Sequence, residues 1–278
     1  IMNEVFEHSF ESHPYRWTPG GSPEYINQAN LSEFMEFYKT FYVPNNACIS
    51  IAGDISLSQS KEWIEKYFGT IPRGTSAVPR PTVVEPEKFA EVRDTVYDNI
   101  QLPAVVQAYH GPAQGTEDAY AVEMMSMILS QGNSSRLQKN VVDKQQKAVY
   151  AGAFPMPTED PGLLLMFGIA NMGTEVLALE DAMNVEVSRM SEELISIEEF
   201  EKLRNQIEND FISGNTSMAG IAESLSDYYL YYNGETNLVN TELERYFNVT
   251  REAILEVAKK YLRPSNRVTL HYLPKTEK

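Results

Sequence analysis

A short motif that occurs twice, 220 residues apart, constrains the fold of this chain more than any other feature. The first copy, at residues 41–54, has the pattern of a helix end, a Pro-Asn turn and a buried strand. The second copy, at residues 261–272, keeps the turn but is less complete. Pro44 in the first copy corresponds to Pro264 in the second, and Asn46 corresponds to Asn266. Repetition at a fixed spacing indicates two copies of one structural unit. We therefore expect one whole repeat, preceded by only the tail of another.

Hydrophobic periodicity predicts an irregular mixture of helices and strands. Helices are predicted at residues 1–12, after the capping box Asn30–Glu33, and at about 56–68, 117–129, 136–146, 177–194, 197–213, 218–232 and 250–262. Strands are predicted at residues 47–52, 92–97, 103–109, 149–154, 162–170 and 267–273. Because helices and strands do not alternate regularly in this order, the predicted fold class is α+β.

A change in composition marks the clearest domain boundary. Proline, glycine and small polar residues concentrate in residues 72–86, which predicts an extended, semi-rigid linker rather than a domain. We expect residues 1–71 to form the C-terminal part of the first repeat, residues 72–91 the linker, and residues 92–278 the second repeat.

Charge and hydropathy exclude several functions. The chain has 39 acidic and 23 basic side chains and a formal net charge of −16. Such a surface repels phosphate backbones, so nucleic acid is not an expected partner. The apolar run that begins at Leu163 is far shorter than the ~20 residues that a membrane helix needs, so no membrane span is expected. The single cysteine, Cys48, lies in a predicted buried strand, where a core thiol is expected and a disulfide framework is excluded.

Four histidines are candidates for metal binding, but their spacing is unfavourable. Zinc-binding helices place two histidines four residues apart, so that both imidazoles leave the same face. His8 and His13 are five residues apart, and Pro14 disfavours a helix at His13. His110 and His271 are isolated at the ends of predicted strands, where structural histidines are expected.

The segment Gly132-Asn133-Ser134-Ser135-Arg136 is the candidate for a nucleophile turn. A nucleophile elbow needs glycine on both sides of the serine, with a strand before it and a helix after it. Here Arg136 replaces the second glycine and a predicted helix precedes the turn, so a helix-capping turn is predicted instead. The residues taken by themselves assemble no catalytic site.

Several motifs, in order along essentially the whole chain, resemble the pitrilysin/insulinase family of zinc peptidases, and in particular the C-terminal portion of a bacterial single-chain member. These motifs are His13-Pro14-Tyr15, residues 41–47, Ala52-Gly53-Asp54, Lys66-Tyr67-Phe68-Gly69 and residues 132–137. The resemblance implies a clam-like pair of similar metallohydrolase-type halves around a chamber. Each half is a two-layer α+β structure in which helices pack on an antiparallel sheet.

The resemblance also implies where zinc binds. The family's zinc site is an H-x-x-E-H helix plus a later glutamate, upstream of the residues that match His13-Pro14-Tyr15. None of those positions is in this chain, and residues 121–130, where the motif helix of the second repeat would fall, contain no histidine. We therefore expect zinc in the full-length parent, and neither a metal site nor a catalytic residue in this chain.

One substrate-binding residue is implied by the resemblance. Active family members often supply, from the second half, an arginine and, seven residues later, a tyrosine that hold the substrate carbonyl. Tyr150 matches the tyrosine, but Asp143 occupies the arginine position, and an aspartate cannot donate a hydrogen bond to an oxyanion. Arg136 is expected to fix its own turn rather than contact substrate.

The favoured hypothesis is that the chain is the C-terminal fragment of a zinc endopeptidase that cleaves peptides or small unfolded proteins. The fragment would be inactive alone and would supply chamber wall and peptide-binding surface, for example by adding the substrate as a strand to a sheet edge. Its other expected partner is the missing N-terminal half or a homologous subunit. The alternative is a non-catalytic partner or scaffold subunit, like the relatives of processing peptidases in respiratory complexes. The resemblance favours a bacterial periplasm or envelope over the cytoplasm.

Overall fold

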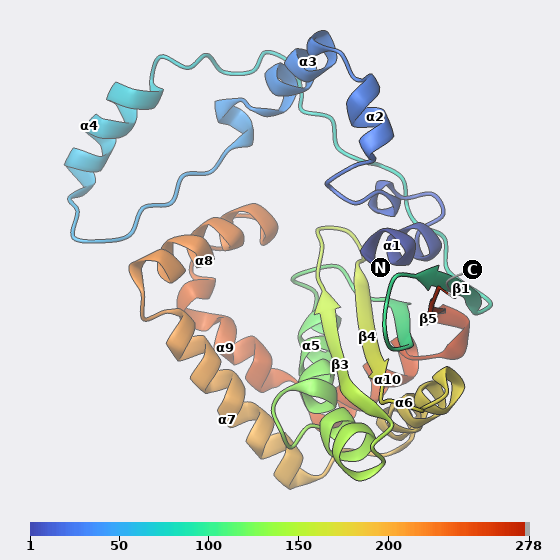
Figure 1. The fold of residues 1–278 in the computed structure, drawn as a ribbon. Helices are drawn as coiled ribbons and strands as arrows, with labels where there is room; N and C mark the ends of the chain where they lie inside the picture. The colour runs from blue at the N-terminus through green and yellow to red at the C-terminus, as the bar shows by residue number, and fades with distance from the viewer. Residues whose placement is uncertain (276–278) are drawn as a thin grey trace. The chain divides into compact units, whose positions relative to one another are not determined.

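The computed structural model describes residues 1–275, which form two compact units (Figure 1). The larger unit, here called the sheet unit, comprises Ile1–Arg16, Val84–Asn209 and Glu242–Lys278. The smaller unit, here called the helical unit, comprises Trp17–Val83 and Asp210–Thr241. No helix within residues 1–275 is both long enough and apolar enough to span a lipid bilayer.

The sheet unit contains one five-stranded sheet, whose strand order is β1-β5-β2-β4-β3. The strands are β1 (Val92–Asp98), β2 (Ala104–His110), β3 (Ala148–Met156), β4 (Leu163–Ala170) and β5 (Arg267–Pro274). The central pairs β2–β4, β2–β5 and β3–β4 are antiparallel, as expected. The prediction of an antiparallel sheet is wrong for β1, which pairs with β5 in parallel. These two strands lie far apart in the sequence, so no hairpin turn fixes their relative direction.

Helices cover both faces of this sheet. They are α1 (Met2–Ser9), α5 (Glu117–Ser130), α6 (Val176–Glu192), α10 (Arg251–Tyr261), the short helices η1 (Pro14–Arg16) and η4 (Pro264–Asn266), and the π-helix η3 (Gln138–Lys144). Two further helices, α7 (Ile197–Gly214) and α9 (Leu238–Asn248), begin or end in the helical unit. Helix α6 contacts β2 and β4, α5 contacts β3, and α10 packs on α5 and α6. Close approach of α6 to β4 requires Gly168, because a Cβ there would lie 2.6 Å from the sulfur of Met183.

The first helix completes the core on the other face. Val5 and Phe10 from the start of the chain pack against apolar residues of β2, β4 and β5. Strand β2 is buried along nearly its whole length, which fits a central strand covered on both faces. The α+β class is therefore confirmed, with the N-terminal helix as part of the core.

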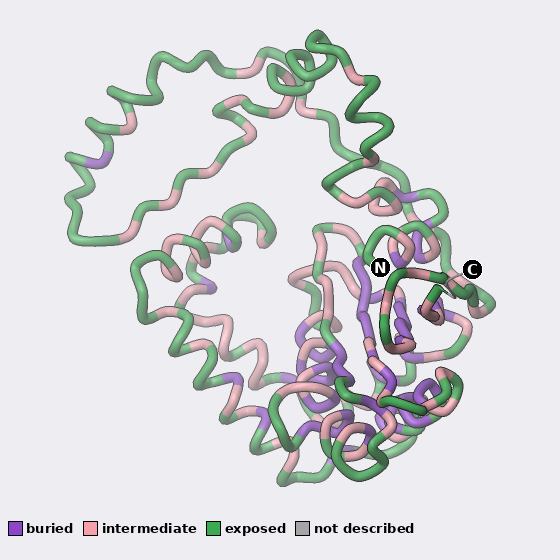
Figure 2. The backbone as a smooth tube through the Cα atoms, in the orientation of Figure 1, coloured by how far each residue is buried: buried purple, intermediate pink, exposed green. Residues whose placement is uncertain are grey.

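The helical unit contains α2 (Pro23–Gln28), α3 (Leu31–Phe41), η2 (Pro44–Asn46), α4 (Leu57–Phe68) and α8 (Met218–Tyr231). The capping box that was predicted at the start of α3 is present: Asn30 accepts from the backbone of Glu33, whose side chain accepts from the backbone of Asn30. Many residues of this unit are exposed (Figure 2).

The internal repeat is visible as repeated local structure. Helices α3 and α10, and the turns η2 and η4 that follow them, begin and end at positions 220 residues apart. In both copies an asparagine side chain closes the turn: Asn46 Nδ2 donates to the Phe41 carbonyl at 2.9 Å, and Asn266 Nδ2 donates to the Tyr261 carbonyl at 2.9 Å. The prediction of two related copies is confirmed for this motif.

The prediction of a buried strand at residues 47–52 is wrong. This segment has no strand structure, Ile49 and Ile51 are exposed, and Cys48 is half-buried rather than a core thiol. A strand needs a neighbour for its backbone groups, and within residues 1–275 no strand pairs with this segment. Its counterpart β5 is buried because it lies between β1 and β2.

The other predicted helices and strands are present, with three departures. The helix predicted at 136–146 is a π-helix over most of its length. Helix α4 is present, but the apolar side chains of Trp63 and Tyr67, which lie on one helical face, are exposed. Helices α2 and α9 have no counterpart in the prediction; α2 is only six residues long, too short for periodicity to reveal it.

Candidate functional site

Tyr150, the one predicted substrate-binding residue, lies on the edge strand β3 and is 48% exposed. A register shift between Ala148 and Tyr150 makes a bulge at this point, and bulges re-aim side chains. The ring lies 6.2 Å from the ring of Phe167 on β4, and its hydroxyl would be 2.6 Å from a Cβ placed on Gly152. Glycine at position 152 therefore lets the tyrosine lie flat over its own strand.

The surroundings of Tyr150 are apolar and open. Val149 and Phe154, on the same strand, are also exposed. The π-helix η3 contacts β3 and carries Asp143, whose carboxylate accepts a hydrogen bond from Gln138 Nε2 at 2.9 Å. A carboxylate accepts hydrogen bonds and carries no positive charge, so Asp143 cannot do what an arginine at this position would do beside Tyr150. Whether Tyr150 contacts a substrate stays a prediction.

Arg136 holds its turn against the start of α7, as expected. Its Nε and Nη2 atoms each donate to one carboxylate oxygen of Glu199, at 3.0 Å. This bidentate bond lowers the pKa of Glu199 from its ordinary value against the opposing effect of burial. The Arg136 side chain is buried and turned inward, so the geometry gives it a structural role.

The two histidines near the start of the chain contact different groups. His8 contacts the Glu4 carbonyl at 2.7 Å through Nδ1 and the Asp94 carboxylate at 3.1 Å through Nε2. His13 is buried and its Nε2 lies 3.2 Å from the Asp160 carboxylate. Within residues 1–275, no three histidine, cysteine, aspartate or glutamate side chains are arranged to hold a metal ion. The described residues therefore do not fit the zinc site of the resembling family.

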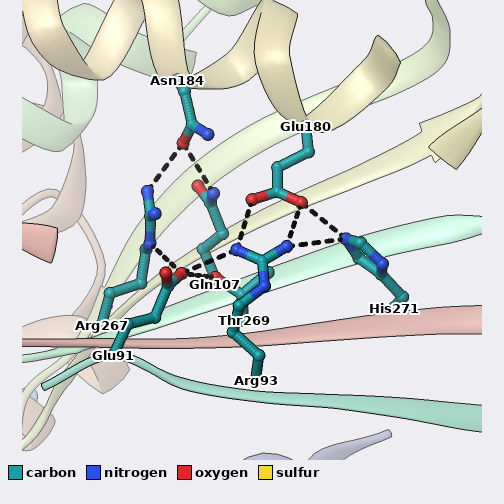
Figure 3. Close-up of polar contacts among 8 residues, drawn as sticks. All are labelled: Glu91, Arg93, Gln107, Glu180, Asn184, Arg267, Thr269 and His271. Atoms are coloured by element: carbon teal, nitrogen blue, oxygen red, sulfur yellow. Dashed lines mark hydrogen bonds and ion pairs between the residues drawn. The ribbon is translucent and has the colours of Figure 1, made fainter. Parts of the chain in front are cut away.

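A partly buried polar cluster joins α6 to the sheet. Its members are Glu91, Arg93, Gln107, Glu180, Asn184, Arg267, Thr269 and His271 (Figure 3). Glu180, on α6, is only 4% exposed and accepts hydrogen bonds from Arg93 Nη1 and Nη2 at 2.8 and 2.6 Å. His271 Nε2 lies 2.6 Å from Oε2 of Glu180, the oxygen that also accepts from Arg93 Nη2. Burial opposes ionisation of Glu180, but these bonds outweigh it and lower its pKa to about 2.

A second carboxylate and an amide complete the cluster. Glu91 Oε1 accepts from Arg267 Nε at 2.7 Å and from Thr269 Oγ1 at 2.8 Å. Asn184 Oδ1 accepts from Arg267 Nη1 and Gln107 Nε2, both at 2.8 Å (Figure 3). Both oxygens of Glu180 are already engaged, so we assign the cluster to fixing α6, β1 and β5 together rather than to proton transfer. No local sequence pattern indicates this cluster, because its members come from segments up to 180 residues apart.

Known proteins resemble this chain in sequence and in structure. A family model described as "Peptidase M16 inactive domain" matches residues 28–207. The chain is 28% identical over 272 residues to the "Zinc protease PqqE" of Helicobacter pylori, which covers 97% of this chain and 61% of that protein. The chain therefore spans less than two thirds of this relative.

Two solved structures share the fold. A crystal structure described as a protease from Helicobacter pylori superposes with a TM-score of 0.93 at 24% identity and covers 99% of this chain and 66% of that one. A chain from Complex III2 of Candida albicans superposes with a TM-score of 0.77 at 14% identity and covers 98% of this chain and 66% of that one. At these identities the likeness shows the fold alone.

Proposed function

This chain belongs to the peptidase M16 family of zinc proteases, through the inactive domain of that family, and on this premise we propose that it is the C-terminal portion of a zinc endopeptidase that cleaves peptides or small unfolded proteins. In this proposal the chain supplies chamber wall and substrate-binding surface, and zinc is held by residues of the parent protein outside this chain. The description of the matching family model as an inactive domain supports this division of roles. We also propose domain boundaries at residues 71 and 91. We further propose that the parent protein is located outside the cytoplasm.

The observation that carries the proposal is the different burial of the two copies of the repeat. On α10, Ile254, Val257 and Ala258 are 0%, 5% and 0% exposed. Their counterparts on α3, Phe34, Phe37 and Tyr38, are 53%, 57% and 56% exposed. Apolar side chains that lie exposed together on one helix face commonly mark an interaction surface. We infer that α3 and residues 47–52 are covered by a partner.

The covered copy indicates the kind of partner. Helix α10 packs on α5 and α6, and β5 is enclosed by β1 and β2. A partner that covers α3 in the same way presents two helices and two strand edges. The N-terminal half of the same protein, or a homologous subunit, meets this description.

Mixing the chain with a separately produced N-terminal half is expected to restore peptide hydrolysis that a zinc chelator abolishes. Neither piece should be active alone, because the zinc ligands and the wall of the chamber are then on different molecules. Cleavage of a quenched fluorescent peptide, with and without chelator, is the measurement. Chelator-sensitive cleavage by the 278-residue chain alone would overturn the proposal.

In the restored enzyme, Tyr150→Phe is expected to lower kcat/KM about 10- to 100-fold, since it removes one hydrogen-bond donor to the substrate carbonyl. Tyr97→Phe is the matched control, because Tyr97 is similarly exposed but lies on β1 at the opposite edge of the sheet. Equal kcat/KM values for the two variants would remove Tyr150 from the proposed binding surface.

The alternative is that the parent is a non-catalytic partner or scaffold. Asp143 at the arginine position favours it, and the shared fold with a chain of Complex III2 is compatible with it. An upstream coding sequence with H-x-x-E-H followed by a glutamate supports the enzyme, and one without that motif supports the scaffold.

A further inference from the structure

The backbone departs from regular geometry three times on the way to Tyr150. Residues 138–144 form the π-helix η3, a rare element that occurs frequently at functional sites. Gln146 has a φ of 51°, in the left-handed region that residues other than glycine rarely adopt. The bulge between Ala148 and Tyr150 follows at once. A backbone conformation such as that of Gln146 persists only where the surrounding structure holds it.

The bulge determines which way Tyr150 faces. Residues two apart in a regular strand point to the same face of the sheet. Ala148 is nevertheless 2% exposed and Tyr150 48% exposed. Ala148 pairs with Ala170 and Tyr150 with Ile169, so Val149 is the extra residue of the bulge. If the bulge moved to the other side of Tyr150, the tyrosine side chain would turn to the opposite face.

Asn171, directly after β4, holds the segment that precedes the bulge. Its backbone N–H donates to the Lys147 carbonyl at 2.9 Å, and its side-chain Nδ2 donates to the Gln146 carbonyl at 3.2 Å. The first bond continues the contact between β3 and β4 beyond the bulge. The second bond holds the carbonyl of the left-handed residue. The Lys147 N–H also donates to the Val141 carbonyl of η3 at 3.0 Å, so this segment is anchored from two sides.

The side-chain amide of Asn171 is itself held in one orientation. Its Oδ1 accepts from the Met172 backbone N–H at 2.9 Å, so Nδ2 is the group that faces Gln146. The Asn171 carbonyl accepts from the Thr174 N–H at 2.9 Å, in a turn that contains Gly173 with a φ of 80°. Asn171 therefore joins its own turn to the start of β3 through both its backbone and its side chain.

We propose that Asn171 is a positioning residue for Tyr150. Its bonds to Gln146 and Lys147 keep the bulge in place, and the bulge presents the tyrosine hydroxyl to the substrate carbonyl. Asn171 acts through Tyr150 and does not itself contact the substrate. This inference rests on the proposed function, because it takes Tyr150 as a substrate contact.

Asn171→Asp tests the side-chain bond with little change in shape. The aspartate still accepts from the Met172 N–H but has no donor for the Gln146 carbonyl. In the enzyme restored with the N-terminal half, this variant is expected to lower kcat/KM about fivefold. The loss should fall mainly on kcat, because the displaced hydroxyl acts in the transition state. Asn99→Asp, the same change at an exposed residue after β1, is the matched control and should leave kcat/KM unchanged.

A double-mutant cycle separates positioning from a general structural role. In a chain that already carries Tyr150→Phe, Asn171→Asp should lower kcat/KM by less than about twofold, because the hydroxyl that it positions is absent. A residue that only stabilises the fold would lower kcat/KM by the same factor in both backgrounds. Equal factors would therefore overturn the proposal.

Fluorine NMR of the 278-residue chain alone tests the same role without zinc or hydrolysis. The probe is 3-fluorotyrosine incorporated at position 150. Asn171→Asp is expected to shift or split its resonance, and Asn99→Asp to leave it unchanged. An unchanged resonance in Asn171→Asp would overturn the positioning role, whatever the restored enzyme does. Failure of the N-terminal half to restore hydrolysis would count against the proposed function alone, because the resonance is measured without it.

Discussion

Replacement of Glu180 by glutamine is expected to lower the free energy of unfolding by about 1–3 kcal/mol, because it removes a buried charged acceptor while its partner Arg93 stays partly solvated. Glu180 is 4% exposed and engages both Arg93 and His271. Glutamine keeps the volume but removes the charge, so Arg93 loses its partner on α6. Urea unfolding followed by circular dichroism measures the change. The control is Glu192→Gln, an exposed acid on the same helix, for which a change within about 0.5 kcal/mol is expected.

The pH dependence of stability gives an independent measurement of the same ion pair. The pKa of Glu180 is lowered from 4.5 to about 2, because the bonds from Arg93 and His271 outweigh the effect of burial. A carboxyl group with a lowered pKa in the folded state contributes its full stabilisation above the unfolded value and loses it as pH falls toward the folded value. The difference in stability between the native protein and Glu180→Gln should therefore shrink between about pH 5 and pH 2. A difference that stays constant over this range would contradict the assigned ion pair.

Replacement of Phe10 by alanine is expected to lower the free energy of unfolding by about 3–5 kcal/mol, through lost burial and the cavity left behind. Phe10 is 2% exposed, and its ring centroid lies 5.3 Å from that of His110 and 5.7 Å from that of Tyr15. It belongs to the apolar cluster on the α1 face of the sheet. The same urea titration measures the loss.

Phe89→Ala is the matched control for Phe10→Ala. The chemical change is identical, but Phe89 is 82% exposed, so stability should change by no more than about 0.5 kcal/mol. Equal effects of the two substitutions would show that the residues before Pro14 do not belong to the folded core.

The features that could be predicted from the sequence are those that depend on neighbouring residues. The capping box at Asn30, the helix that follows it and the Pro-Asn turn are each determined by a few adjacent side chains. Strand β2 was predicted from its β-branched composition. Tyr150 was identified only through the family resemblance, because a single exposed tyrosine has no recognisable pattern of its own.

The features that were missed depend on residues far apart in the chain. Residues 47–52 have strand-like composition, but a strand exists only where another strand pairs with it. The ion pairs around Glu180 join residues from α6, β1 and β5, which come together only after folding (Figure 3). The parallel direction of β1 likewise follows from tertiary packing and not from any local signal.

The two Pro-Asn turns have the same local geometry, which affects the free energy of binding a partner at α3. Helix α3 and its turn already have the bounds and the asparagine hydrogen bond of the buried copy, although their apolar residues are exposed. A partner that covers α3 would therefore meet a helix and turn that already have the local structure of the buried copy. The conformational entropy lost on association is correspondingly small, and more of the free energy of apolar burial remains as affinity.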